Sequence, residues 1–460
     1  MLAACASSAS APLSPQLSAR ARLLRIEDTR RDEPAFVDSL IADANPQLRA
    51  SAALAAGRIG ARAHLAQLRL LAADADTAVS SNALFALGLM KDSAAAAIAA
   101  RALHAGVPQG TEAAFLLGEI GDRGRDAIVA GLADASLAPA TRGALLLASA
   151  RLRPIPAGAV VPLMSSPDTA IAWRAAYVIA RGRSAAGTRA LLGLANSPSV
   201  AVREQVARGA AKGITGDSLG AMGHEVLLRL VADTSARVRI NAVRSLSTFG
   251  AGDRDLVLAA MRDRDAGVRV QAAQSLEPVL AGDSVAWRAA FTIDTSIVVR
   301  RSVADGAIRH GVDLAASARW ASSDDWRLRA AAAELSSRGT AADAFRRLDP
   351  FTRDADGRVR AAATGALARV ADSTAARASV RARLRELLAD ADVGVRSSAL
   401  EALTRAAGPD DLAAALGAYR RSVMDGDNDA RLAFWRLADT VLARRTSLPD
   451  SVERGVAGLA

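Results

Sequence analysis

The sequence predicts an all-α protein in which about 12 to 13 antiparallel helix pairs stack into a superhelical α-solenoid. Two observations predict this fold: a short motif recurs along the 460 residues at a nearly constant spacing, and each copy leads into an apolar pattern with the period of an α-helix. No strand pattern recurs beside it. A fixed period of about 30 residues is typical of stacked helical repeats, in which each repeat buries its apolar face against its neighbours.

The motif is an Asp followed six residues later by an Arg, with an apolar residue directly before the Arg. Its clearest copies begin at Asp263, Asp354 and Asp390. In the last of these, apolar residues follow the Arg at three, four and seven positions, which form one stripe of a helix. We therefore predict that the motif opens the second helix of each pair and that its Asp caps the helix start.

Aligning the copies on the Arg gives thirteen positions separated by 29 to 36 residues, with a mean of about 32. Five of these positions lack one or both of the motif residues: Ser80, Gly110, Arg142, Arg203 and Arg329. We expect the paired residues to cap helices and to link neighbouring repeats, without ligand contact; an exposed pair contributes under about 1 kcal/mol. Eight positions have both motif residues: Asp43 and Arg49, Asp168 and Arg174, Asp233 and Arg239, Asp263 and Arg269, Asp294 and Arg300, Asp354 and Arg360, Asp390 and Arg396, Asp425 and Arg431.

The recurring Asp and Val-Arg resemble the HEAT repeat family, in which these residues open the second helix. The early segments Ala86-Leu-Gly88-Leu and Leu117-Gly118-Glu-Ile-Gly121-Asp are similar to the bacterial subtype also found in phycobilin lyases. The resemblance covers roughly residues 20 to 445 and implies the solenoid architecture. Because the family hosts many unrelated functions, the resemblance implies no particular activity.

The array divides into segments by composition. Prolines from Pro154 to Pro162 interrupt the rhythm and predict a longer turn there, because proline breaks a helix interior. The segments are a flexible Pro- and Ser-containing leader (1–18), N-terminal repeats (19–150), basic middle repeats (151–215), C-terminal repeats (216–445) and a tail (446–460).

Glycines follow the apolar stripes of the N-terminal repeats at Gly57, Gly60, Gly88, Gly118 and Gly121. Helix C-caps commonly need a positive φ, which glycine adopts without strain. We therefore expect these five glycines to end helices.

Cys5 is the only cysteine, which excludes intrachain disulfides and Cys-based zinc sites. Leu2-Ala3-Ala4-Cys5 resembles a bacterial lipobox, whose Cys is lipidated after signal cleavage. The basic and apolar regions that precede a lipobox are absent, so the resemblance implies a start upstream of Met1 or a trimmed chain. It further implies a lipoprotein anchored in the bacterial envelope and facing the periplasm or exterior. The alternative is an incidental cysteine in a cytoplasmic chain.

The net charge is +10, and residues 141–215 hold ten basic against two acidic residues. One explanation is structural, since Arg at helix C-termini offsets the helix dipole. The other is an electropositive patch for an acidic protein, a polyanion or an anionic membrane surface. The candidate binding residues of this patch are Arg151, Arg153, Arg181, Arg183, Arg208 and Lys212.

Tryptophans cluster in the C-terminal repeats, where Trp320 and Trp326 are candidate peptide anchors. Most tryptophans in such arrays belong to the core, so exposure decides between the two roles. No stretch approaches 18 uncharged apolar residues, so we expect no transmembrane helix.

The sequence indicates no enzyme. Its four histidines belong to different repeats, and it contains no phosphate-binding loop and no HExxH or CxxC motif. We therefore expect no catalytic residue, no cofactor and no metal. We expect a non-catalytic scaffold that binds a protein or peptide on the concave face of the solenoid. The alternatives are a nucleic-acid or polyanion binder that uses the basic segment, and the scaffold part of a chaperone or prolyl-isomerase system whose catalytic domain is absent.

Overall fold

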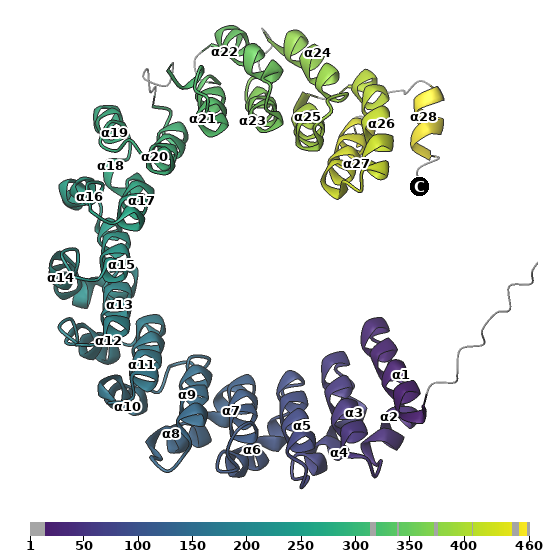
Figure 1. The fold of residues 1–460 in the computed structure, drawn as a ribbon, viewed down its shortest axis with the longest axis vertical. Coiled ribbons are helices and arrows are strands. Elements are labelled where there is room, and N and C mark those ends of the chain that lie inside the picture. Colours follow the sequence, from purple (N-terminus) through teal and green to yellow (C-terminus); the bar gives the residue numbers. More distant parts are fainter. Residues whose placement is uncertain are drawn as a thin grey trace, which may run out of the picture. The chain divides into compact units, whose positions relative to one another are not determined.

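The computed structural model describes residues 14–312, 319–337, 340–371, 376–406, 408–443 and 450–457. All regular structure in these ranges is helical, and no strand occurs in them. The predicted all-α solenoid fold is therefore confirmed (Figure 1). No helix of the described ranges is long and apolar enough to cross a membrane. Contacts divide the chain into two compact units, Met1–Phe249 and Gly250–Ala460.

In the first unit, the odd-numbered helices from α1 to α15 contact one another in order and form one layer, and the even-numbered helices form the other (Figure 1). We call these the second-helix layer and the first-helix layer. The helices are α1 (Pro15–Thr29), α2 (Pro34–Ile41), α3 (Pro46–Ile59), α4 (Leu65–Leu71), α5 (Thr77–Leu89), α6 (Ala96–Ala102), α7 (Gln109–Glu119), α8 (Arg125–Ala133), α9 (Pro139–Ser149), α10 (Ala157–Val160), α11 (Thr169–Gly182), α12 (Ala185–Leu192), α13 (Val200–Gly209), α14 (Lys212–Leu230) and α15 (Ala236–Leu246).

In the second unit, α17, α20, α21, α23, α25 and α27 contact one another in order and form the second-helix layer. The last described helix, α28, packs on α26. The helices are α16 (Arg254–Ala260), α17 (Ala266–Gln274), α18 (Glu277–Leu280), α19 (Ser284–Phe291), α20 (Ile297–Arg309), α21 (Trp326–Leu335), α22 (Ala341–Leu348), α23 (Gly357–Leu367), α24 (Arg377–Leu387), α25 (Val393–Ala406), α26 (Pro409–Met424), α27 (Asn428–Ala443) and α28 (Asp450–Ala457).

The thirteen aligned motif positions fall in thirteen different helices of the second-helix layer. Except in α7 and α11, the aligned residue is the fourth residue of its helix. The repeat spacing in the sequence therefore corresponds to one helix pair per repeat.

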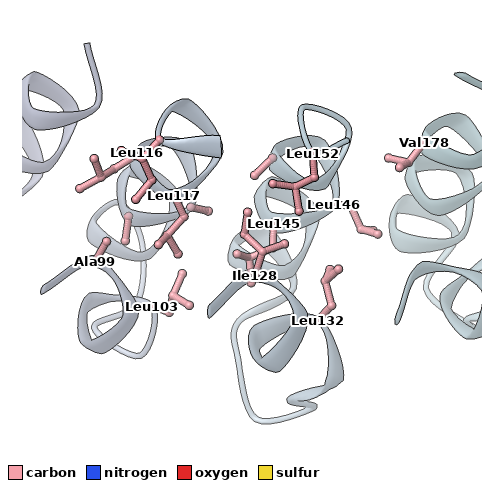
Figure 2. Packing of buried hydrophobic residues seen from close by; sticks show 14 of the residues in the cluster. Ala99, Leu103, Leu116, Leu117, Ile128, Leu132, Leu145, Leu146, Leu152 and Val178 are labelled. Atoms are coloured by element: carbon pink, nitrogen blue, oxygen red, sulfur yellow. The ribbon is translucent and has the colours of Figure 1, made fainter. Parts of the chain in front are cut away.

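The core of the first unit lies between its two layers. Figure 2 shows Leu117 of α7 next to Leu103 of α6, and Leu145 of α9 next to Ile128 of α8. All four side chains are buried. Burying each such side chain contributes about 1.5–3 kcal/mol. Because each helix pair buries its apolar faces against its neighbours, the core runs continuously from pair to pair.

The first helix begins earlier than the composition indicates. α1 starts at Pro15, inside the segment expected to be a flexible leader, and the Ser14 hydroxyl accepts the Leu17 N–H (3.3 Å). Proline at the first helical position is preorganised for a helix start. The longer turn expected near Pro162 corresponds to the four-residue α10 and the 3-10 helix Val161–Ser165.

Three of the five N-terminal glycines do not end helices, which corrects the C-cap expectation. Gly60 and Gly121 have positive φ, at 73° and 63°. Gly57, Gly88 and Gly118 lie inside α3, α5 and α7 at contacts with the next second helix. A Cβ on Gly57 would lie 2.5 Å from the Ala86 Cβ. These positions need glycine because backbones of neighbouring helices approach closely there.

The motif Arg ties its own turn to the turn of the next repeat. In Arg360, Nε and Nη2 donate to the Asp390 carboxylate (2.9 and 2.7 Å), while Nη1 donates to the carbonyls of Asp354 and Ala355 (2.9 and 3.1 Å). We call this arrangement the Arg–Asp link. The same link joins Arg49 to Asp74, Arg203 to Asp233, Arg269 to Asp294, Arg329 to Asp354 and Arg396 to Asp425.

The motif Asp lies two residues before the helix cap, so the predicted capping role is wrong for most repeats. Asp390 Oδ1 accepts the N–H of Asp392 (2.8 Å), and α25 starts at Val393. Asp43 and Asp263 accept the N–H two residues on in the same way (2.7 and 2.8 Å). The carboxylate thus closes the turn and receives the preceding Arg. Asp168 is different, because it caps α11 itself.

Further aligned arginines donate to groups of their own repeat. Arg239 Nη1 and Arg300 Nε donate to the carbonyls of Asp233 and Asp294, each at 2.8 Å. Arg174 donates to the Ala170 carbonyl in its own helix (2.8 Å), and Arg431 to Asn428 Oδ1 (3.2 Å).

The Arg–Asp links lower the pKa of their carboxylates in several repeats. The guanidinium of Arg329 lowers the pKa of Asp354, and that of Arg203 lowers the pKa of Asp233. At Asp390, burial opposes the shift, but the bonds from Arg360 and from the Asp392 N–H outweigh it and lower the pKa. These carboxylates are therefore ionised near neutral pH.

Replacing Arg360 by Leu is expected to lower the free energy of unfolding by about 1–3 kcal/mol, because the partly buried Asp390 carboxylate then has no guanidinium. Urea denaturation at neutral pH, followed by circular dichroism, measures the change. Arg346→Leu is the control, since Arg346 is exposed and binds Asp343 within α22. Equal effects of the two substitutions would show that the link does not stabilise the stacking.

Candidate partner-binding surface

A cavity of about 300 Å³ opens between three successive helices of the second-helix layer, α20, α21 and α23. Ala330 and Ala362 line it with methyl groups, and Trp326 supplies an aromatic wall. The remaining lining residues are charged: Arg301, Arg327, Glu334 and Arg358. Small side chains at the two alanine positions leave room that a larger residue would fill. We call this the Trp326 cavity.

Trp326 is placed by the start of its helix. It is the first residue of α21, and the N-cap Asp325 accepts the Arg327 N–H (2.7 Å). The guanidinium carbon of Arg358, from the first turn of α23, lies 3.9 Å from the indole ring centre, which is a cation–π contact. The indole is half-buried, so part of it remains available to a ligand.

Glu334 and Arg301 form the polar side of the cavity. Arg301 Nη2 donates to both carboxylate oxygens of Glu334 (3.1 and 3.2 Å), and its Nε donates to Asp305 (2.9 Å). Burial raises the pKa of Glu334, although Arg301 acts against that shift. This pair is held within the protein and has little capacity left for a ligand.

The guanidinium groups at the rim differ in how firmly they are held. Arg358 makes two bonds to Asp356 (3.0 and 2.6 Å), which lower the pKa of Asp356 to about 2. Arg327 is exposed and lies 3.5 Å from Asp325, at the limit of a hydrogen bond. Arg327 is therefore the cation at this rim that an incoming carboxylate can most readily bind.

The structure separates the two candidate tryptophans. Trp320 is 4% exposed and packs against Phe291, with ring centres 4.6 Å apart, so its proposed role as a surface anchor is wrong. Trp326 lines the cavity. Sequence reasoning missed Arg301, Glu334 and Arg358. Repeat register could have found Arg358, because it lies two residues before its motif Arg, as Arg327 does in the preceding repeat.

The candidate basic residues lie along one edge of the second-helix layer. Arg151 and Arg153 follow α9, Arg181 and Arg183 stand at the end of α11, and Arg208 lies near the end of α13. Because α9, α11 and α13 pack side by side, their C-terminal ends line the same edge. Lys212 begins α14 close to this edge. We call this the basic edge.

Most cations of residues 141–215 lack an acidic partner. Two of the ten form ion pairs, Arg151 with Glu119 (3.0 Å) and Arg203 with Asp233 (2.7 Å). Arg153 donates to backbone carbonyls, Arg208 to Asn241 (2.9 Å), and Arg181 lies over Tyr177. Across the described residues, the other eight cations make no ion pair. In that part of the chain, no contacting carboxylate neutralises their charge.

A second cavity, of about 290 Å³, marks a repeat that lacks the motif Arg. Ser80 occupies the Arg position there, and Asp74, Arg101 and Gln109 line the space with it. Gln109 reaches toward the Ser80 hydroxyl (3.5 Å) without filling the gap. This cavity follows from the missing side chain of the Arg–Asp link.

The histidines stay in separate repeats in the structure. Buried His64 lies between Asp38 (2.8 Å) and Asp32 (3.2 Å), and His310 stacks on Trp287. In the described ranges, no group of three or more His, Cys, Asp or Glu residues could hold a metal ion. Cys5 lies outside the described residues.

Comparisons with known proteins bear on the fold. No family model and no curated protein matches the chain. The present chain aligns with a chain of a structure in which Kap95p binding induces the switch loops of RanGDP to adopt the GTP-bound conformation. The TM-score is 0.53 and the sequence identity is 12%. The alignment covers 95% of the present chain and 62% of that chain, so the present chain spans less than two thirds of its neighbour.

Two further structures align with lower scores. One is a chain of a homology model of the full-length AP-3 complex in an intermediate open conformation (TM-score 0.46, 12% identity, 96% of this chain and 93% of that one). The other is an engineered protein (TM-score 0.31, 18% identity, 80% and 98%). At 12% identity the first likeness shows the fold alone. Together with the thirteen repeated helices, it identifies the chain as a helical repeat protein with an all-α solenoid fold.

Proposed function

We propose that this chain is a non-catalytic scaffold of the HEAT type that binds a protein partner on its second-helix layer. The observation that carries the proposal is the Trp326 cavity, where three successive second helices leave room for a side chain. An aromatic wall above small residues supplies the kind of anchor that dominates binding energy at interfaces. The Kap95p–RanGDP likeness supports the proposal, since that structure concerns a protein bound to a protein.

The chemistry of the cavity indicates the kind of segment it takes. Ala330, Ala362 and the indole offer apolar contact, which favours an aliphatic or aromatic side chain. Arg327 at the rim favours a carboxylate beside that side chain. We therefore propose a partner segment in which an apolar residue stands next to Asp or Glu.

A second candidate function is the binding of a polyanion along the basic edge. It is favoured by the eight cations of residues 141–215 that no carboxylate neutralises in the described part of the chain. Four of them, Arg153, Arg181, Arg183 and Arg208, lie at the C-terminal ends of α9, α11 and α13. These are parallel helices of one layer, which pack about 8–10 Å apart. A repeating row of positive charge at that spacing suits an extended polyanion such as nucleic acid.

We further propose that Cys5 carries lipid and tethers the scaffold in a bacterial envelope. The support is the sequence Leu2-Ala3-Ala4-Cys5, its resemblance to a lipobox and its position before the first helix. A tethered scaffold would meet its protein partners at the membrane surface, away from nucleic acid. The tether therefore favours the first candidate function over the second.

Trp326→Ala is expected to weaken the binding of peptides selected by display on the full chain at least tenfold, or about 1.4 kcal/mol. Ala362→Arg should do the same, because it fills the cavity and leaves the indole in place. Fluorescence anisotropy with labelled peptides measures both effects. The selected peptides should carry an apolar residue beside Asp or Glu.

Trp173→Ala is the matched control, since Trp173 is also half-buried beside an arginine but lies in α11. It should leave the affinity unchanged. Peptides that bind all four proteins equally would disprove a role for the cavity. A loss of several kcal/mol of stability on Trp326→Ala, as at a core site, would instead place the indole in the core.

The basic edge predicts salt-dependent binding to a short fluorescein-labelled duplex DNA between about 20 and 200 mM NaCl. Combined Arg153→Ala, Arg181→Ala and Arg183→Ala should make the negative slope of log K against log[salt] shallower by about two to three. The control removes the same charge from ion-paired sites, with Arg309, Arg346 and Arg353 changed to Ala. Absence of binding at the lowest salt, or equal slopes for both variants, would eliminate this function.

Expression with the native upstream codons should give a membrane-bound protein whose intact mass shows two or three acyl chains on Cys5. Cys5→Ser should be soluble or unprocessed, because the lipidated thiol is then absent. Membrane fractionation and intact mass spectrometry measure both properties. A soluble, unmodified wild-type protein would remove the tether from the proposal.

A further inference from the structure

The last described second helix, α27, exposes a position that the twelve preceding repeats bury. In each of the first twelve repeats, the residue four positions after the aligned motif residue has a side chain that is at most 3% exposed. These residues run from Ala53 in α3 to Leu400 in α25. In α27 this position is Trp435, which is 37% exposed. A large indole therefore occupies a place where the other repeats are covered.

The exposed position faces the side on which the next repeat would pack. Gly57 lies eight residues after Arg49, and its Cβ position meets Ala86 of the following second helix. The equivalent residue in α27 is Asp439, and it lies on the same helix stripe as Leu432, Trp435 and Leu442. Leu432 and Leu442 are 51% and 48% exposed. Among the described helices, no second helix packs on this stripe, although it corresponds to the surface on which the next repeat packs elsewhere.

The motif Arg of this last pair also lacks its usual partner. Six earlier arginines bind the Asp of the following repeat. Arg431 is exposed and donates to Asn428 in its own helix, and no carboxylate of the described ranges binds it.

The first and last described helices are complementary halves of a pair. α28 packs on α26 in the first-helix layer, and no described second helix follows it (Figure 1). α1 packs on α3 in the second-helix layer, and no described first helix precedes it. On α1, Leu17 and Leu24 are 54% and 64% exposed and share one stripe, roughly opposite buried Leu23 and Ile26.

We propose that copies of this chain associate head to tail, with α1 of one copy packed on α27 beside α28 of another. The contact continues the interface that already joins neighbouring repeats, and α28 with the incoming α1 makes a new helix pair. Leu17 and Leu24 meet the apolar stripe of α27. Arg20, which flanks the stripe on α1 and has no carboxylate partner among the described residues, lies on the side to meet Asp439.

The geometry sets the strength and form of the association. One helix packed on a helix pair buries less than the roughly 1,600 Å² of a standard stable interface, so the affinity is low. Different surfaces meet at the two ends, which makes the contact heterologous. Such contacts repeat into rings or open chains of copies.

Sedimentation velocity of the full chain between about 1 and 200 µM tests this association. The weight-average mass of the wild-type protein should rise with concentration beyond that of a dimer. Trp435→Glu and Leu24→Glu should each stay monomeric, because each variant loses one of the two surfaces. An equimolar mixture of the two should form dimers and nothing larger, since one intact surface of each kind remains.

Leu70→Glu is the control, because Leu70 is an exposed leucine of α4 (77%) and α4 is neither the first nor the last described helix. It should associate as the wild type does. Circular dichroism establishes that all variants are folded. A monomeric wild type at the highest concentration, a mixture that remains monomeric, or an equal loss of association in Leu70→Glu would each overturn the proposal.

Discussion

The stacking of the repeats depends on a guanidinium that belongs to one turn and binds the next. Arg360 donates to two carbonyls of its own turn and to the carboxylate of Asp390 in the following repeat, and Asp390 then accepts the N–H of Asp392. Apolar packing of Ala, Leu and Val holds neighbouring helices together without specifying how far one slides past the other. A planar group with directed donors allows little sliding. The link therefore sets register, and packing supplies most of the stability.

The first unit reaches the same stacking with fewer links. Between Arg49 and Arg203, the aligned positions are Ser80, Gly110, Arg142 and Arg174. Within the described residues, none of them bonds to an Asp of the next repeat. Close backbone contact replaces the link there, because Gly88 and Gly118 let adjacent second helices approach to where a Cβ would clash. At Ser80, which occupies the position of the motif Arg, the missing guanidinium leaves a cavity.

Both candidate binding surfaces arise from the parallel second helices that this stacking creates. At the Trp326 cavity, neighbouring helices present residues of equivalent register, so Arg327 and Arg358 both reach one indole. At the basic edge, successive helix C-termini carry arginines along one line. The same logic explains the exposed stripe of α27, which is the surface that each repeat offers to the one after it.

From the sequence alone, the fold class, the repeat number and the layer of each motif helix could be predicted, because a fixed period requires stacked units. The sequence also singled out Trp326, and the Asp and Arg positions as places where repeats meet. Tertiary structure decided the rest. Periodicity does not show which side chains are covered, so Trp320 and Trp326 became distinguishable only by burial. It also could not separate a helix-ending glycine such as Gly60 from a contact glycine such as Gly57, since the difference lies in how closely the next helix approaches.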